Sequence, residues 1–346
     1  MTKPLALPER FVPEDFVVEE IPAYSPAGEG AHTFVRVEKR GRTTEEVASS
    51  LARAAGVRPR DVGYAGRKDR HAVTTQWLSA PGLEPEAALA LRMPGVRVLE
   101  AARHPHKLRT GHLRGNRFTI TLHGVSEVSA VQARERLEAF ARLGMPNRFG
   151  AQRFGREGDN AERGRAVLCG ELRPRDRRKA RFWVSALQSA VFNEALRLRD
   201  LPLHEVEAGD VAVVVGRGGL FVVTDVEREA ERAARFEISA TGPIFGARAG
   251  TRDPAPEGRV AAREAQAMLR LGLDPSALAA PPRGLRLPGG RRALRVRAAD
   301  ATALHEGDRL RLGFVLPPGS YATVLLEELS RSEPDELSRS DPKELS

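Results

Sequence analysis

The chain has 346 residues, enough for about two domains and a sizeable buried core. Hydrophobic residues make up 41% of it and charged residues 29%, which is the balance of a soluble globular protein. No apolar run approaches the roughly 18 residues that a membrane span requires, and residues 1–10 lack the apolar core of a signal peptide. The single cysteine, Cys169, excludes a disulfide within this chain and a cysteine-clustered zinc site. We therefore expect a cytoplasmic protein that does not enter a membrane.

The net charge of +9 is unevenly distributed along the chain. Residues 103–181 hold 19 Lys and Arg against 8 Asp and Glu, a local excess of +11. Such an excess favours binding to a polyanion. The alternative is a general bias in composition, since 49 of the 55 basic residues are Arg, as a GC-rich genome would give. The clustering of basic residues in one part of the chain argues against a composition bias alone. The Arg side chain also offers a planar fork for phosphate and a face for stacking bases.

A helix followed by a hairpin is predicted early in the chain. Over residues 43–56, Thr43 can cap a helix, Glu46 can close the capping box and Gly56 can end it. Residues 63–78 begin with small residues, continue through a cluster of charged residues and end in a run of β-branched residues. This order predicts a strand, a loop and a second strand, with the loop at the end of a strand and the sheet covered by the helix.

The loop contains one acid, Asp69, among Arg67, Lys68, Arg70 and His71. Surrounding cations favour the ionised carboxylate and should lower its pKa. A carboxylate that stays ionised, with no second acid in the loop, suits a nucleophile or an electrostatic stabiliser better than a proton donor. On the charge pattern alone, a solvated β-turn with mixed charges is the better description.

Hydrophobic periodicity and turn residues predict the other elements. Strands are expected over 11–21 (an edge strand that begins at Pro13), 32–39, 96–104, 115–123 and 308–316, and two more within 209–225. Helices are expected over 84–92, 131–143, 182–196 and 255–273, and after Tyr321. The basic run 173–181 should be a helix start that faces phosphate, and 281–292 should be a connector. The eight-residue repeat at the C-terminal end should be disordered.

Residues 66–77, Gly-Arg-Lys-Asp-Arg-His-Ala-Val-Thr-Thr-Gln-Trp, resemble the catalytic motif of the TruD family of tRNA pseudouridine synthases. Five further segments resemble motifs of that family in the same order, and the similarity covers nearly all of residues 8–330. They are Pro-Glu-Asp-Phe-Val-Val-Glu-Glu at 13–20, Gly-Asn-Arg-Phe at 115–118, Asn-Arg-Phe-Gly-Ala-Gln-Arg-Phe-Gly at 147–155, Ser-Ala-Leu-Gln-Ser-Ala-Val-Phe-Asn at 185–193 and Leu-Pro-Pro-Gly-Ser-Tyr-Ala-Thr at 316–323.

The resemblance implies an α+β fold of the pseudouridine-synthase type. Its sheet would be mixed and mainly antiparallel with flanking helices, and an α/β TRUD module would be inserted into it. We expect a discontinuous catalytic domain at 1–143 and 291–330, the inserted module at 144–290, and a disordered tail at 331–346.

The activity implied is isomerisation of a uridine, usually at position 13, to pseudouridine in tRNA. Asp69 would attack a flipped nucleotide at C1′ or at C6 of the base, and the sequence leaves both open. No cofactor or metal is required, and the expected partner is tRNA, bound by a monomer.

The resemblance also implies the other site residues. Arg10 would pair with the nucleophile, although it could equally be a solvated charge. The substrate-binding residues would be Phe16, Lys68, Asn116, Phe118, Arg148, Arg153 and Tyr321. The amide of Asn116 has the donors and the acceptor to read a uracil edge, and Phe118 offers a face for stacking. The alternatives are a turn Asn and core aromatic residues.

Two other functions compete with the synthase. A non-catalytic RNA-binding protein could share the fold, but the intact motifs disfavour it. An N-glycosidase with an Asp nucleophile would release free uracil, and the lack of a second positioned carboxylate disfavours it.

Overall fold

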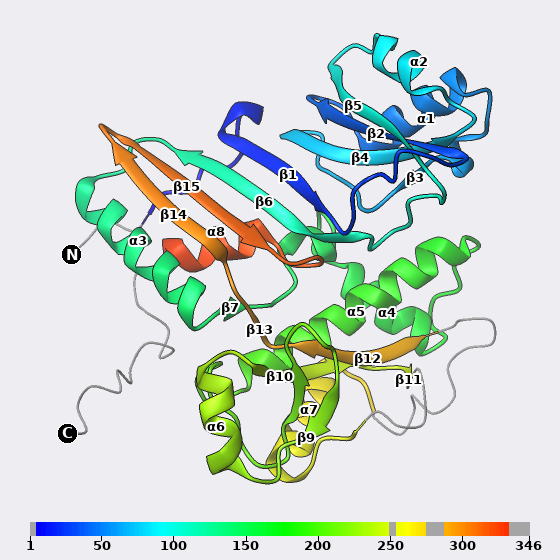
Figure 1. Cartoon of the computed structure of the whole chain (residues 1–346). Coiled ribbons are helices and arrows are strands. Elements are labelled where there is room, and N and C mark those ends of the chain that lie inside the picture. Colours follow the sequence, from blue (N-terminus) through cyan, green and yellow to red (C-terminus); the bar gives the residue numbers. More distant parts are fainter. Residues whose placement is uncertain (1–4, 249–253, 275–286, 332–346) are drawn as a thin grey trace. The chain divides into compact units, whose positions relative to one another are not determined.

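The computed structural model describes residues 5–248, 254–274 and 287–331 (Figure 1). The chain divides into two compact units. Unit 1 takes Met1–Ala141 and Ala298–Gly319, and unit 2 takes Arg142–Arg297 and Ser320–Ser346. This division differs from the predicted domain bounds at residues 291–297 and at the last helix, and the catalytic and inserted domains stay a prediction. From residue 332 onward the repeat tail lies outside the described residues.

Unit 1 is built on an eight-stranded sheet in the order β14-β15-β6-β1-β4-β2-β5, with β3 paired to β4. The strands are β1 (Phe16–Pro22), β2 (His32–Lys39), β3 (Gly63–Tyr64), β4 (Val73–Pro81), β5 (Val96–His104), β6 (Leu113–Leu122), β14 (Ala299–Glu306) and β15 (Arg309–Leu316). Only β1 and β4 run parallel, and the other pairs are antiparallel. The sheet is therefore mixed and mainly antiparallel, as the sequence predicted.

Strand β1 is central, so the prediction of an edge strand was wrong. It lies between β6 and β4. Pro13, which suggested an edge, lies in the short 3₁₀ helix η1 (Pro13–Asp15) before the strand begins. Its missing N–H therefore costs no hydrogen bond of the ladder.

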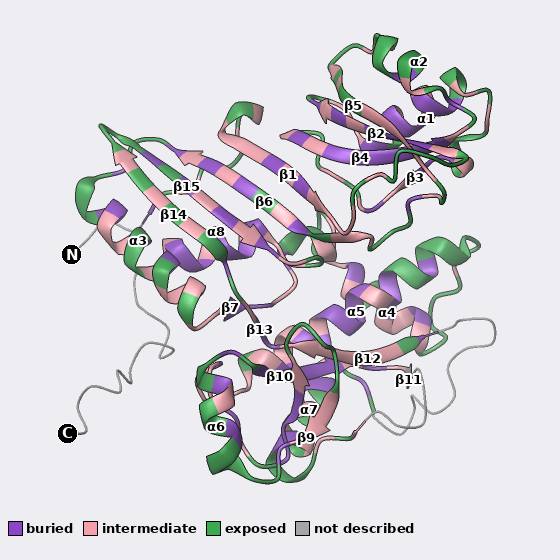
Figure 2. Cartoon of the chain, viewed as in Figure 1, coloured by how far each residue is buried: buried purple, intermediate pink, exposed green. Residues whose placement is uncertain are grey.

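Helix α1 (Thr44–Ala54) forms as its sequence predicts and covers β2 and β4. The Oγ1 atom of Thr43 accepts from the N–H of Glu46 at 3.2 Å, and the Glu46 carboxylate accepts from the N–H of Thr43 at 2.6 Å. Leu51 is fully buried in a cluster that includes Val35 and Leu78 of these strands. Figure 2 shows buried residues along β4 and α1. Unit 1 also contains α2 (Pro85–Ala90) and most of α3 (Glu127–Arg142).

Strand β14 had no counterpart among the predicted elements. It pairs with β15, and a bulge between Ala299 and Thr302 places Asp300 at φ 50°. None of its residues is fully buried, and Leu304 is 54% exposed. Its half-buried positions are Ala301, Ala303 and His305, so the sequence lacks the alternation of large apolar and polar residues that marks most strands.

The described residues of unit 2 combine a five-stranded sheet in the order β11-β12-β10-β8-β9 with five α-helices. The strands are β8 (Val211–Val214), β9 (Leu220–Val222), β10 (Ile238–Ile244), β11 (Ala247–Arg248) and β12 (Pro288–Ala293), and β7 (Met145–Pro146) pairs separately with β13 (Arg295–Val296). The helices are α4 (Asn160–Leu168), α5 (Arg177–Arg197), α6 (Val226–Ala234), α7 (Gly258–Arg270) and α8 (Ala322–Ser330). The expected connector 281–292 thus ends in strand β12, because its glycines and arginines hid the strand pattern.

Helix α5 is the central helix of unit 2. Its buried residues Leu187, Val191 and Phe192 contribute to two apolar clusters. It packs closely against α4, because a Cβ at Gly164 would lie 2.2 Å from the carbonyl oxygen of Trp183. Among the described residues, no helix combines the length and apolar character needed to cross a membrane.

Replacing Leu51 by Ala should destabilise the protein by about 2–5 kcal/mol, because it removes buried methyl groups and leaves a cavity between α1 and the sheet. Leu89 in α2 is 45% exposed and is the matched control, with an expected change within about 0.5 kcal/mol. Urea unfolding of both variants measures the difference. Equal losses would mean that the packing of α1 on the sheet does not matter for stability.

Candidate active site

Asp69 lies in the loop between β3 and β4, at the tip of a strand as predicted. Strand β3 pairs with β4 through Gly63 and Tyr64, which closes the hairpin. The carboxylate of Asp69 is exposed and makes no hydrogen bond or ion pair within the described part of the chain. The side chain is therefore available to an incoming group.

Among the described residues, the cations next to Asp69 make no ion pair with its carboxylate. Each forms an ion pair with an acid from another element: Arg67 with Glu45 (2.6 Å), Arg70 with Glu46 (2.7 Å) and Lys68 with Glu20 (2.7 Å). These contacts tie the loop to α1 and β1. The expectation that the same cations face the carboxylate was wrong, because a nearby helix and strand supply carboxylates that the loop sequence does not reveal.

The Lys68–Glu20 pair is buried, with side chains 6% and 1% exposed. The second oxygen of Glu20 also accepts from the backbone N–H of Trp77 at 3.2 Å. A buried charge without a partner costs several kcal/mol, so breaking this pair is strongly disfavoured. In this structure Lys68 anchors the loop to β1, and its binding of substrate stays a prediction.

Lys39 is the residue that the sequence reasoning missed. It ends β2 with 1% exposure, and its ammonium donates to the carbonyl oxygens of Arg42 (2.8 Å), Lys68 (3.2 Å) and Asp69 (2.7 Å). An ammonium has three donors, and all three are used. The sequence indicates the burial of Lys39 only by its position, because residues two apart share one face of a strand and Val37 is buried.

Burial lowers the pKa of Lys39 to about 8, and the strongest opposing influence is the charge of Asp69. Lys39 thus combines two functions. It fixes the backbone of the loop, and it places beneath that loop a positive charge that interacts with the Asp69 carboxylate.

Thr44 fixes the loop from the side of α1. Its hydroxyl oxygen accepts from the backbone N–H of Lys68 and donates to the amide oxygen of Gln76, both at 2.9 Å. Thr44 and Gln76 are buried. The loop backbone is therefore held by side chains from β2 and α1, and Gln76 of β4 fixes the Thr44 hydroxyl, so the exposed Asp69 carboxylate is carried by a well-anchored backbone.

Arg10 does not contact Asp69. Its guanidinium lies against the ring of His71, with Nη2 2.6 Å from Nδ1. The expected ion pair with the nucleophile is thus absent from the described contacts, and Arg10 reaches the loop two residues away from Asp69. A role for Arg10 in the reaction stays a prediction.

The structure brings two of the predicted substrate-facing aromatic residues together. Phe16 on β1 and Phe118 on β6 meet edge to face with ring centroids 6.2 Å apart, and Phe118 also stacks on Phe314 of β15 at 5.3 Å. Phe118 is only 7% exposed. Phe118 therefore packs mostly in the core of this structure, and its contact with a base stays a prediction.

Asn116 lies directly opposite Glu20 in the β1–β6 ladder. Glu20 pairs with Lys68, the neighbour of Asp69, so the register of the sheet connects Asn116 to the Asp69 loop. The Oδ1 atom of Asn116 is buried and has no hydrogen-bond partner within the described residues. Buried acceptors are normally satisfied, so an open one indicates a site for a donor.

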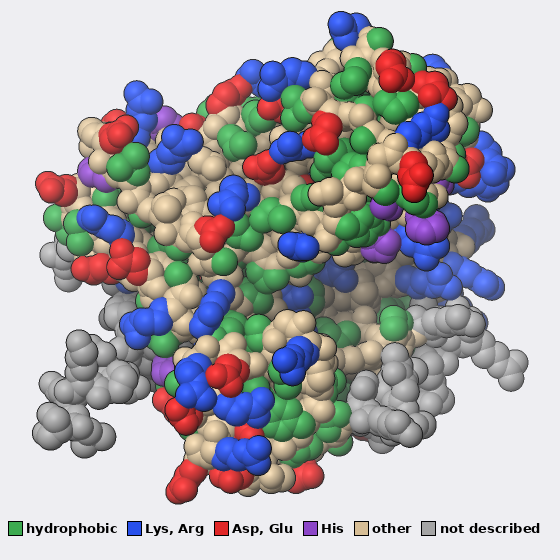
Figure 3. Space-filling view, viewed as in Figure 1, with side chains coloured by type: hydrophobic (Ala, Val, Ile, Leu, Met, Phe, Trp, Pro, Cys, Tyr) green, Lys and Arg blue, Asp and Glu red, His purple; other side chains and the backbone are tan. Residues whose placement is uncertain are grey.

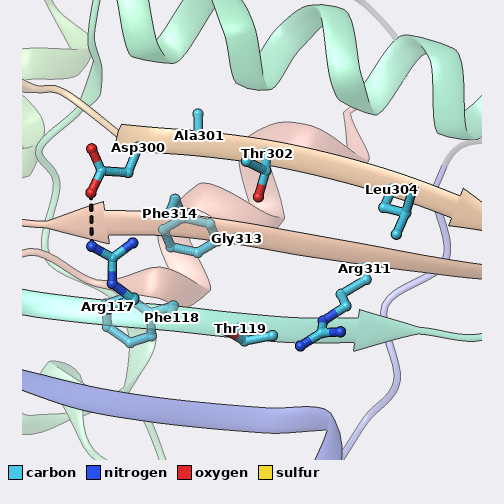
Figure 4. Close-up of a pocket in the computed structure, with 10 residues that line it drawn as sticks. All are labelled: Arg117, Phe118, Thr119, Asp300, Ala301, Thr302, Leu304, Arg311, Gly313 and Phe314. Atoms are coloured by element: carbon cyan, nitrogen blue, oxygen red, sulfur yellow. Dashed lines mark hydrogen bonds and ion pairs between the residues drawn. The ribbon is translucent and has the colours of Figure 1, made fainter.

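A pocket of about 620 Å³ lies over β6, β14 and β15 (Figure 4). Arg117 donates to Asp300 at 2.8 Å in this pocket, and Arg311 lies farther along the same strands. Phe118 also lines it, whereas Asp69 and Asn116 do not. The pocket has the size of a small-ligand site, but it does not join the predicted residues into one cavity.

Arg148 of unit 2 is held by helix α8. Its guanidinium donates to Glu328 at 3.0 Å and to Glu327 at 2.6 Å. Burial lowers the pKa of Arg148, but the hydrogen bonds and charges of the two carboxylates together raise it above its usual value. Arg148 therefore fixes α8 in this structure, and its binding of substrate stays a prediction.

Arg153 and Tyr321 meet at the ring of Phe149. Tyr321 precedes α8 and packs edge to face on Phe149 at 6.2 Å, and the Arg153 guanidinium lies 6.0 Å from the same ring. Arg292, which the sequence did not single out, lies over this ring at 4.2 Å. Burial lowers the pKa of Arg292 to about 10. Unit 2 therefore carries its own cluster of arginine and aromatic side chains.

Residues 10–174 and 172–329 match the model of the family described as tRNA pseudouridine synthase D (TruD). The chain belongs to this family. A relative named tRNA pseudouridine synthase D from an Anaeromyxobacter species is 45% identical, with 92% of this chain and 91% of that protein aligned. Another with this name, from Thermus thermophilus, is 43% identical, with 94% and 88% aligned.

A crystal structure of a putative TruD protein from Methanosarcina mazei superimposes with a TM-score of 0.76 at 22% identity, covering 96% of this chain and 95% of that one. This match shows that the two proteins share the TruD fold. The predicted family and the predicted α+β fold class are therefore confirmed.

Replacing Lys39 by Met should change how stability depends on pH. Its pKa is about 8 when folded and 10.5 ordinarily, so between these values the unfolded chain binds more protons than the folded one. The free energy of unfolding contributed by Lys39 is therefore lowest below pH 8 and rises as the pH increases toward 10.5. The Met variant lacks this rise.

Urea unfolding of wild type and Lys39→Met at pH 7.5 and 9.5 measures the effect. We expect the stability difference between the two proteins to shift in favour of wild type at pH 9.5. Parallel pH profiles would show that Lys39 titrates as an ordinary lysine.

Proposed function

We propose that this chain is a tRNA pseudouridine synthase in which Asp69 is the nucleophile. The observation that supports it most is the construction of the Asp69 loop. The carboxylate is exposed, while the backbone that carries it is tied to a buried ammonium and a buried hydroxyl. A nucleophile held in a fixed position needs little reorganisation when the substrate arrives.

The chemistry requires one carboxylate. Asp69 attacks an extruded uridine at C1′ or at C6 of the base, and the bond between N1 and C1′ breaks. The base rotates, C5 bonds to C1′, the proton on C5 leaves, N1 gains a proton and the carboxylate is released. The product is an isomer of the substrate, so no oxidant or reductant enters the reaction.

Asn116 is suited to hold the uracil. Its open Oδ1 can accept from N3–H of the base, and its amide N–H groups can donate to a uracil carbonyl. Phe16 and Phe118 supply an aromatic wall next to it. Extrusion of the base costs a few kcal/mol, which such contacts must offset.

Three finer assignments rest on the family resemblance and belong to the same proposal. The target is position 13 of tRNA, the protein acts as a monomer, and it works in the cytoplasm, where its substrate is found.

Asp69→Asn should abolish pseudouridine formation and leave tRNA binding within about threefold of wild type, because the side chain is exposed and the change is isosteric. Tritium release from tRNA labelled at C5 of uridine measures turnover, and nucleoside analysis locates the product. A wild-type protein that forms no pseudouridine, or an equally active variant, would refute the proposal. Accumulation of free uracil would instead identify an N-glycosidase.

Asn116→Ala should lower kcat/KM about 5- to 150-fold, the equivalent of about 1–3 kcal/mol for a lost hydrogen bond to the substrate. Thr121→Ala is the matched control, because Thr121 lies on the same strand but on its opposite face. If both variants keep full activity, Asn116 does not read the base.

A further inference from the structure

Six basic residues precede or begin helix α5 and are all exposed. They are Arg173, Arg175, Arg177, Arg178, Lys179 and Arg181, named here the basic collar. The only acid among residues 173–181 is Asp176, whose carboxylate caps the helix by accepting from the backbone N–H of Arg178 at 2.8 Å. No side chain of the collar makes an ion pair within the described part of the chain, which leaves a local charge of +5 over nine residues.

The arginines of helix α6 are neutralised by neighbouring acids. On and just after α6, Arg228, Arg232 and Arg235 each pair with a glutamate. In Figure 3, Lys and Arg side chains lie among Asp and Glu side chains over the lower part of the drawn face, whereas a group of Lys and Arg at its right edge has no acid within it. The basic collar departs from this pattern, so its charge is not used in ion pairs among the described residues.

The collar also opposes the electrostatics of its own helix. Cations in a first turn are disfavoured by the helix dipole, and α5 begins with Arg177, Arg178 and Lys179. Helices α1 and α6 carry glutamates in their first turns instead. Helix α5 persists because its later residues, such as Val184, are buried. The cations of the first turn therefore do not stabilise the helix through its dipole. The same cations would bind a polyanion favourably.

An exposed aromatic ring lies next to the collar. Phe182 is 44% exposed, and the guanidinium of Arg153 lies 5.6 Å from the ring centroid. One residue further, the ammonium of Lys179 lies 5.0 Å from the ring of Trp183. Cations beside an open aromatic face are the combination that binds phosphates and stacks bases of unpaired nucleic acid. An acidic protein or lipid surface would not require the ring.

We propose that the basic collar and Phe182 form a docking surface for the sugar–phosphate backbone and one unpaired base of RNA, and that this RNA is the substrate tRNA. The second part rests on the proposed function. Phosphate contacts and stacking do not distinguish one base from another, so the surface contributes affinity and does not select the uridine.

The test uses the full chain with Asp69→Asn, which separates binding from turnover. In this background the collar variant carries Arg173→Gln, Arg175→Gln and Arg178→Gln. The control carries Arg217→Gln, Arg228→Gln and Arg235→Gln, which removes the same charge from the same unit. The Kd for unmodified tRNA is measured from 50 to 300 mM KCl.

The collar variant should bind at least tenfold more weakly at the lowest salt concentration. Its slope of log Kd against log salt should fall by about 2–3, since each lost phosphate contact removes about 0.7–0.9. The control should stay within twofold of the parent. Phe182→Ala should weaken binding and leave the slope unchanged, because stacking releases no counterions.

An unchanged Kd and slope in the collar variant, or an equal loss in the control, would overturn the proposal. So would a parent that fails to bind tRNA. The melting temperature of the collar variant should equal or exceed that of the parent, because repulsion at the helix start is relieved. If the melting temperature is lower, the tRNA affinities of the single variants Arg178→Gln and Phe182→Ala are used in its place to test the proposal. Pseudouridine formation by wild type tests the proposed function separately.

Discussion

One buried ammonium holds the loop that carries Asp69. Lys39 donates to the carbonyl oxygens of Lys68 and Asp69, and its charge is the buried counterpart of an exposed carboxylate. Burial works against that charge, so the ammonium persists only because its three donors are satisfied and an acid lies nearby. The position of the proposed nucleophile therefore depends on a buried ammonium whose desolvation cost is offset by its hydrogen bonds.

The central place of β1 extends this arrangement across the sheet. Glu20 contacts Lys68 on one side and lies opposite Asn116 on the other, because β1 lies between β4 and β6. A shift of one residue in the register of β1 would turn Glu20 to the opposite face and break both connections. The loop, the anchoring ion pair and the open amide acceptor are thus parts of one arrangement that the strand order creates.

Charge serves two different purposes in this chain. Around the Asp69 loop, arginines are neutralised by glutamates of α1 and work as ties between elements. At the start of α5, the basic collar has no such partners among the residues that the structure describes, and its first turn opposes the helix dipole. Composition cannot distinguish these cases, since both are rich in arginine. The difference lies in whether folding brings a carboxylate to each cation.

The sequence alone determined the features that depend on neighbours along the chain. The capping residues of α1, the hairpin that carries Asp69 and the family motifs are local, and the structure and comparisons confirm them. Local pattern also explains two failures: β14 buries no residue fully, and Pro13 resembles the start of an edge strand.

Only the tertiary structure decided which groups meet. Lys39 reaches the loop from 30 positions away, and Glu20 reaches Lys68 from 48. Arg10 meets His71 instead of the predicted Asp69. Partners of this kind are selected by strand order and by the burial of each charge, and neither quantity is encoded in the spacing of residues along the chain.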